Sequence, residues 1–106
     1  MGCVIVNADF LANNKAAVDA FLREYKASVE FVINPANIEE SAKLVVDREI
    51  IAQQAVAVAA IPECNIVFID GDEMQRLSDG FFEVLYNANP QSVGGALPDD
   101  GIYYKG

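Results

Sequence analysis

The stretch Ile66-Val67-Phe68-Ile69, followed at once by Asp70-Gly71, is a buried-strand candidate in this chain of 106 residues. Four consecutive large apolar residues, three of them β-branched, are typical of a short strand that is buried on both faces. The Asp-Gly pair supplies the turn that ends it. Val4-Ile5-Val6 repeats the pattern near the start of the chain and ends at Asn7. These two runs predict two short strands, and strands that helices join within one sheet are usually parallel.

Helical patterns fill most of the remaining sequence. Apolar residues at steps of three and four predict a long helix that Asn13 or Asn14 can cap and that stops near Asn34. The segment from 50 to 60 is apolar nearly all round, so the third expected helix should be buried on most of its circumference. The expected helices run from 14 to 34, from 37 onward, from 50 to 60 and from 72 to 89.

The expected fold class is therefore α/β and helix-rich, with two short strands and about four helices in one unit spanning 1–106. A chain of this length makes one domain at most. Its hydrophobic fraction of 53% supplies enough apolar material for a core. Two strands need helical cover to be stable, so the pattern resembles a piece of a larger α/β lobe.

The C-terminal run from Asn89 to Tyr104 combines turn residues with aromatic anchors. It contains two prolines, three glycines and two tyrosines, which predicts a structured tail. The glycine pair allows a positive φ or a close backbone approach. The two tyrosines are expected to pin the end of the chain to the body of the fold, with ligand stacking as the alternative. The residues expected to have a structural role in this tail are Gly94, Gly95, Pro98, Tyr103 and Tyr104.

Charge and composition exclude several classes of function. Seven basic and sixteen acidic residues give a net charge of −9, which repels nucleic acid and anionic membrane surfaces, so no nucleic-acid partner is expected. The chain has no histidine, which excludes a Ser-His or Cys-His nucleophile and a His-ligated metal. We expect no catalytic residue, no cofactor and no metal site. The acidic groups at 70–73 and 99–101 are expected to cap a helix and to form a turn, not to hold a cation.

Cys3 and Cys64 are the two cysteines, and each begins one of the expected strands. Side-by-side strands would bring the two thiols together, so a disulfide is one expectation. Two buried reduced thiols are the other. The sequence leaves both open.

Three blocks of the sequence carry a resemblance to a known family. Gly2–Val6, the Ala-Ile-Pro-Glu-Cys-Asn-Ile-Val-Phe-Ile block at 60–69 and the run at 89–100 resemble the last third of a bacterial ABC-transporter solute-binding protein. The subgroup handles sulfonates, taurine, nitrate or thiamine-precursor pyrimidines. The resemblance implies the C-terminal part of one lobe of a periplasmic-binding-protein type II fold, with Gly2, Cys3 and Val4 as a hinge-like crossing.

The resemblance also implies a function for the parent protein. That protein would be the extracytoplasmic substrate-binding component of an ABC importer, periplasmic or anchored as a lipoprotein, with a small solute and the permease as partners. The resemblance covers none of the second lobe and we expect no secretion signal in this sequence, so alone the chain is not expected to bind solute, and its ligand contacts are unknown. The alternative is a small helical protein-interaction domain without ligand or catalysis. In either case the apolar third helix predicts self-association, with a dimer as the expected state.

Overall fold

Asparagine side chains cap two of the helical elements in the first part of the chain. In the computed structural model, which describes residues 2–106, Asn7 accepts a hydrogen bond from the Phe10 backbone N–H at 3.1 Å and begins the first helix. Asn34 accepts from the Ala36 N–H at 3.0 Å, and Pro35 stands at the start of the short 3-10 helix that follows. The elements here are α1 (Ala8–Asn13), α2 (Lys15–Ile33), η1 (Pro35–Asn37), α3 (Ile38–Asp47), α4 (Gln54–Ala60) and η2 (Ile61–Cys64).

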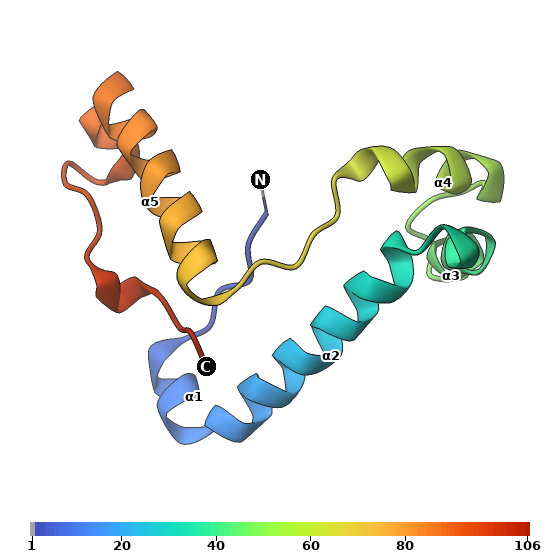
Figure 1. Ribbon diagram of the computed structural model, residues 1–106, viewed down its shortest axis with the longest axis horizontal. Helices are drawn as coiled ribbons and strands as arrows, with labels where there is room; N and C mark the ends of the chain where they lie inside the picture. The colour runs from blue at the N-terminus through green and yellow to red at the C-terminus, as the bar shows by residue number, and fades with distance from the viewer. Residues whose placement is uncertain (1) are drawn as a thin grey trace. The chain divides into compact units, whose positions relative to one another are not determined.

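A long helix and a returning tail form the rest of the molecule (Figure 1). The chain divides into two compact units, of which unit 1 ends at Phe68 and unit 2 begins at Ile69. Unit 2 contains α5 (Gly71–Ala88), η3 (Pro90–Val93) and η4 (Asp100–Ile102).

The α/β prediction is wrong, because residues 2–106 contain no strand and the fold is small and all-α. The runs 4–6 and 66–69 lie in irregular backbone, and neither pairs with a neighbour. A β-branched run favours extended backbone, but a strand also needs a second strand beside it. Here the later run joins the two units. The expected partial lobe of a periplasmic-binding-protein type II fold, with its two strands, is therefore corrected to a helical fold.

The third expected helix is also corrected. The α3 helix ends in a Schellman motif, in which the Ile50 N–H donates to the Val45 carbonyl and the Glu49 N–H to the Val46 carbonyl, both at 2.9 Å. Glu49 takes a positive φ of 59°, so the helix cannot continue through it. The next helix, α4, begins only at Gln54. It is not buried on most of its circumference, since Ala57 is its one buried residue.

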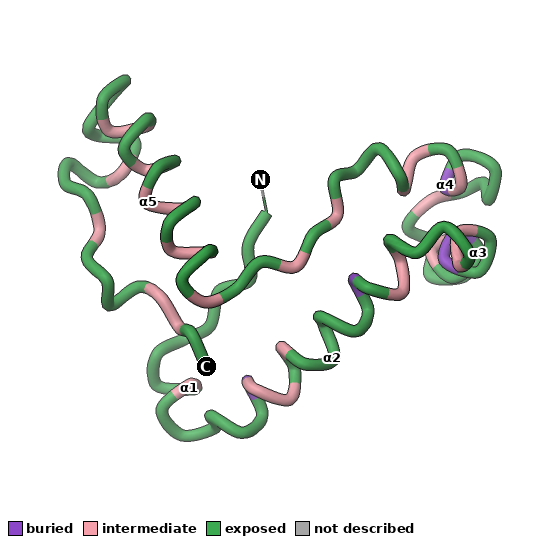
Figure 2. The backbone as a smooth tube through the Cα atoms, in the orientation of Figure 1, coloured by how far each residue is buried: buried purple, intermediate pink, exposed green. Residues whose placement is uncertain are grey.

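The core is small and lies in unit 1. Figure 2 shows the buried positions on α2, α3 and α4. The α3 and α4 helices pack side by side through small residues, Ser41 and Ala42 on one and Ala57 on the other. Val18 and Val29 are the buried residues of α2. The hydroxyl of Ser41 has no hydrogen-bond partner within the described chain.

Candidate functional site

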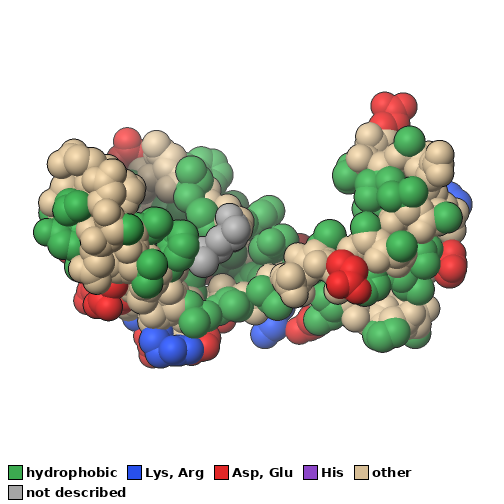
Figure 3. Space-filling view, turned by 90° about the horizontal axis from the view of Figure 1, so that it is seen from above, with side chains coloured by type: hydrophobic (Ala, Val, Ile, Leu, Met, Phe, Trp, Pro, Cys, Tyr) green, Lys and Arg blue, Asp and Glu red, His purple; other side chains and the backbone are tan. Residues whose placement is uncertain are grey.

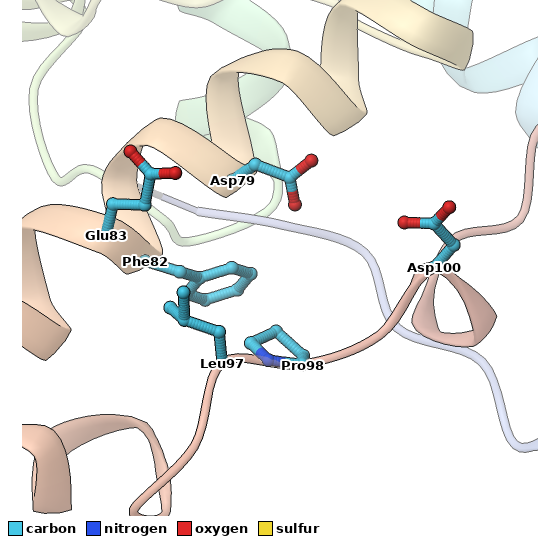
Figure 4. A pocket seen from close by; sticks show the side chains of 6 residues that line it. All are labelled: Asp79, Phe82, Glu83, Leu97, Pro98 and Asp100. Atoms are coloured by element: carbon cyan, nitrogen blue, oxygen red, sulfur yellow. The ribbon is translucent and has the colours of Figure 1, made fainter.

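Unit 2 carries a cavity of about 190 Å³ between α5 and the returning tail. Figure 4 shows the ring of Phe82 pointing from the helix toward Leu97 and Pro98 of the tail. Three carboxylates flank this apolar floor, with Asp79 and Glu83 one helical turn apart on α5 and Asp100 on η4. The cavity is thus apolar at its base and negatively charged at its rim.

Polar side chains tie the tail to α5 on one side of that helix. The Lys105 ammonium lies 2.6 Å from Asp72 Oδ1, and Gln75 Nε2 donates to Asp100 Oδ1 at 2.8 Å. One turn further on, the Tyr103 hydroxyl donates to Asp79 Oδ1 at 2.7 Å. The helix positions used are 72, 75 and 79, and steps of three and four residues place them on one helix face. These ties hold the tail where it forms the cavity wall.

Burial and hydrogen bonds to charged neighbours change the pKa values of three of these groups. Burial, and then the hydrogen bond to Asp79, raise the pKa of Tyr103 to about 12. The hydrogen bond from Lys105 lowers the pKa of Asp72, and that from Arg76 lowers the pKa of Glu73. At neutral pH Tyr103 is therefore a hydrogen-bond donor, whereas Asp72 and Glu73 are charged.

Unit 1 carries a larger and more apolar cavity of about 370 Å³. We call it the α2-end groove. It lies where the end of α2 meets the start of α3 and the segment after α4, and its two polar lining residues are Asn34 and Asn65. Its apolar lining residues are Val32, Ile33, Pro35, Ile38, Ile61, Pro62 and Ile66.

The residues of the expected hinge and disulfide are all exposed. Gly2, Cys3 and Val4 lie in irregular backbone before α1 and make no backbone hydrogen bond within the described chain. Cys3 and Cys64 are both free thiols in the structure. Cys64 ends η2 and its thiol donates to the Ala60 carbonyl at 3.2 Å.

The tail positions lie around the unit 2 cavity or beside it. Gly94 and Gly95 adopt positive φ values of 81° and 90° after η3, a backbone region that favours glycine. Pro98 lines the cavity, and Tyr103 makes the bond to Asp79 described above. Tyr104 is half-buried beside it. The structure places the Tyr103 hydroxyl against a side chain of α5.

Sequence reasoning missed the α5 half of this cavity. Asp79, Phe82 and Glu83 belong to an amphipathic helix and resemble ordinary surface and core positions when read alone. The available signal was the i, i+4 pair of carboxylates with an aromatic residue between them, on a helix that is followed by a tail rich in turns. That signal shows which residues share a side of the helix, but not that the tail folds back over them.

Neither cavity shows an arrangement of side chains that identifies a reaction. Residues 2–106 hold no group of three or more Cys, Asp or Glu side chains arranged to bind a metal ion. Over the same residues, no helix has both the length and the apolar character needed to span a membrane. Comparison with known proteins finds no match, since no protein-family model, curated protein or solved structure is significantly similar to the chain.

Proposed function

We propose that this chain is a structural part of the extracytoplasmic solute-capturing component of an ABC importer, and that its own role there is assembly. The importer assignment is supported by the resemblance of blocks 60–69 and 89–100 to such proteins. In the structure the first block forms η2 and the segment that leads into unit 2, and the second forms η3 and most of the tail. Neither block contributes a catalytic group, and we assign the chain no enzymatic step.

One observation carries the assembly role: large apolar side chains are exposed while the core is small. Four apolar residues are buried within residues 2–106, namely Val18, Val29, Ala42 and Ala57. Apolar side chains reach the surface over much of the face drawn in Figure 3. Large exposed apolar patches mark contacts with proteins, membranes or ligands, and of these we assign contact with another polypeptide. The exposed set on α5 consists of Leu77, Phe81 and Val84.

The charge of the unit 2 cavity argues against solute capture by the chain alone. Asp79, Glu83 and Asp100 surround it. Three carboxylates repel the sulfonate or nitrate anions that the resembled family carries. The apolar groove of unit 1 offers no cationic side chain among its lining residues that could bind such an anion. Solute binding is therefore assigned to the complete importer component.

Calorimetry on the purified chain tests the division of roles. Taurine, an alkanesulfonate, nitrate and hydroxymethylpyrimidine should each give no binding heat at millimolar concentration. Binding of any of them with micromolar affinity, about −8 kcal/mol, would contradict the proposal.

The gene neighbourhood tests the importer assignment separately. A permease gene and an ATPase gene should lie beside the gene for this chain, and the chain should co-purify with that permease when the neighbouring genes are expressed together. Absence of both genes would remove the importer role. The exposed apolar faces would then favour the second candidate, a helical protein-interaction domain, which should associate with protein partners in a manner that none of the four solutes changes.

A further inference from the structure

Three Asp-Gly pairs occur in this chain, and each lies in a different local structure. They are Asp70-Gly71, Asp79-Gly80 and Asp100-Gly101. In such a pair the glycine nitrogen can attack the aspartate side chain and close a succinimide ring. Glycine favours this reaction because it has no Cβ to shield the nitrogen or to restrict the backbone rotation that ring closure needs. The three pairs therefore share one chemistry and differ in how the fold holds them.

The pair at Asp70 and Gly71 is unbonded at both of its reacting groups. Asp70 is the N-cap residue of α5, with an extended backbone, and its exposed side chain makes no capping hydrogen bond. Gly71 is the first residue of that helix, so its N–H has no intrahelical acceptor, and no other bond to it exists within residues 2–106. Hydrogen bonding therefore restrains neither the carboxyl group nor the attacking nitrogen.

The pair at Asp79 and Gly80 is held by the middle of α5. The Asp79 carboxylate accepts the hydrogen bond from the Tyr103 hydroxyl at 2.7 Å. Gly80 lies inside the helix, where a backbone N–H donates to the carbonyl four residues earlier. Ring closure at this pair therefore requires the middle of α5 to open first.

The pair at Asp100 and Gly101 lies in η4 and is bonded at both reacting groups. Gln75 Nε2 donates to Asp100 Oδ1 at 2.8 Å, and the Gly101 N–H donates to Asp99 Oδ1 at 2.9 Å. The Tyr103 N–H also donates to the Asp100 carbonyl at 3.2 Å, which restrains the backbone between them. Ring closure here has to break these bonds.

We propose that Asp70-Gly71 is a site of spontaneous isoaspartate formation, and that the fold protects the other two pairs. The Gly71 nitrogen bonds to the side-chain carboxyl carbon of Asp70, and the proton of that nitrogen leaves with the carboxyl hydroxyl as water. A water molecule then opens the ring at the former main-chain carbonyl of Asp70. The main chain afterwards runs through the Asp70 side chain, and the old carbonyl becomes a free carboxyl group. Water is the co-reactant that the two steps release and consume.

The product changes the segment that joins the two units. Unit 1 ends at Phe68 and unit 2 begins at Ile69, directly before Asp70. The Asp70 carbonyl accepts from the Met74 N–H at 3.1 Å, in the first turn of α5. In isoaspartate this oxygen leaves the main chain, which becomes one carbon longer, so the first turn of α5 loses its fixed acceptor. The inference does not depend on the importer role, and each can fail without the other.

Storage of the purified full chain in heavy-oxygen water tests the proposal, because each ring opening adds a heavy oxygen to the aspartate that reacted. Peptide mapping with electron-transfer fragmentation distinguishes the three pairs. In the folded chain, isoaspartate should accumulate at Asp70 at least about ten-fold faster than at Asp79 or Asp100, since the latter two react only after local opening. Asp70→Ser keeps a capping residue without a carboxyl group, so it should abolish the product at this position and leave the helicity unchanged.

The unfolded chain is the matched control. In guanidinium chloride the helical and side-chain bonds that hold Asp79 and Asp100 are lost, so the three pairs should react at similar rates. A preference for Asp70 that persists in the unfolded chain would show that the fold does not cause it. That result, similar rates at the three pairs in the folded chain, or no isoaspartate at Asp70 in the folded chain would each overturn the proposal.

Discussion

Unit 1 is stabilised by different interactions from those that stabilise unit 2. Every buried residue among 2–106 belongs to unit 1, where Ser41, Ala42 and Ala57 bring α3 and α4 into close contact. Over its described length, unit 2 has no fully buried residue. Its tail is fixed to α5 by the bonds from Gln75, Tyr103 and Lys105. We therefore expect the stability of unit 1 to depend on side-chain volume, and that of unit 2 to depend on ionisation.

Ala57→Leu should show the largest effect, and in unit 1 only. Ala57 has no exposed surface, so added methylenes have to push α4 away from α3. Overpacking of this kind costs about 1–3 kcal/mol, and we expect about 2 kcal/mol here. Urea unfolding followed by circular dichroism should show a lower midpoint with an unchanged slope.

Ala59→Leu is the matched control for that substitution, since it adds the same atoms on the exposed side of α4. Its midpoint should stay close to that of the original chain. Equal losses for the two variants would show that α3 and α4 are not packed through Ala57.

Helix positions could be predicted from the sequence because the signals are local. The stripe that ends at Asn34 corresponds to α2, and the pattern between Asp72 and Asn89 corresponds to α5. The strand prediction failed at Ile66–Ile69 because pairing depends on a partner far along the chain, which no local pattern supplies. The helix expected over 50–60 forms only from Gln54, because Glu49 adopts the positive φ of a Schellman motif although it is not a glycine, and residues 50–53 are irregular.

Ser41→Ala should shift the stability of unit 1 in the opposite direction, by a smaller amount. The Ser41 hydroxyl is buried without a hydrogen-bond partner in the described chain. Removing an unsatisfied buried polar group, and gaining helix propensity, should stabilise α3 and its packing by about 1 kcal/mol. The urea midpoint should rise.

Ser28→Ala separates the two contributions to that gain. Ser28 is exposed on α2, so its replacement changes helix propensity without relieving a buried group. The gain for this control should be at most a few tenths of a kcal/mol. If the gains are equal, the buried hydroxyl of Ser41 carries no penalty and the packing description of α3 is wrong.

The cavity of unit 2 shows a second limit of sequence reasoning. Turn residues such as Gly94 and Gly95 predict that the tail bends, and the tyrosines predict that it is anchored. Which residue of α5 accepts the hydrogen bond from Tyr103 depends on how the tail folds back. The residue spacing within the helix and within the tail does not determine how the two segments align. The pairing of Tyr103 with Asp79 could therefore be seen only in three dimensions.

Ionisation of Tyr103 should produce the smallest effect, confined to unit 2. Burial and the bond to Asp79 raise its pKa to about 12, against 10.0 for an ordinary tyrosine. Because the folded pKa is the higher one, this contribution to stability is complete below pH 10 and is lost as the pH rises through about 12. Absorbance titration of the phenolate should show a step near pH 12, accompanied by release of the tail.

Tyr103→Phe should remove that step and cost about 0.5 kcal/mol at neutral pH, since it deletes one hydrogen bond on a half-buried side chain. Tyr86→Phe takes away a phenol elsewhere on α5 and should leave the step near pH 12 in place. The alkaline change should not reach the packing of α3 against α4, because Ala42 and Ala57 carry no ionisable group. If unit 1 unfolds together with the tail at that step, the two units share one cooperative transition, and the contrast between packing and polar ties no longer holds.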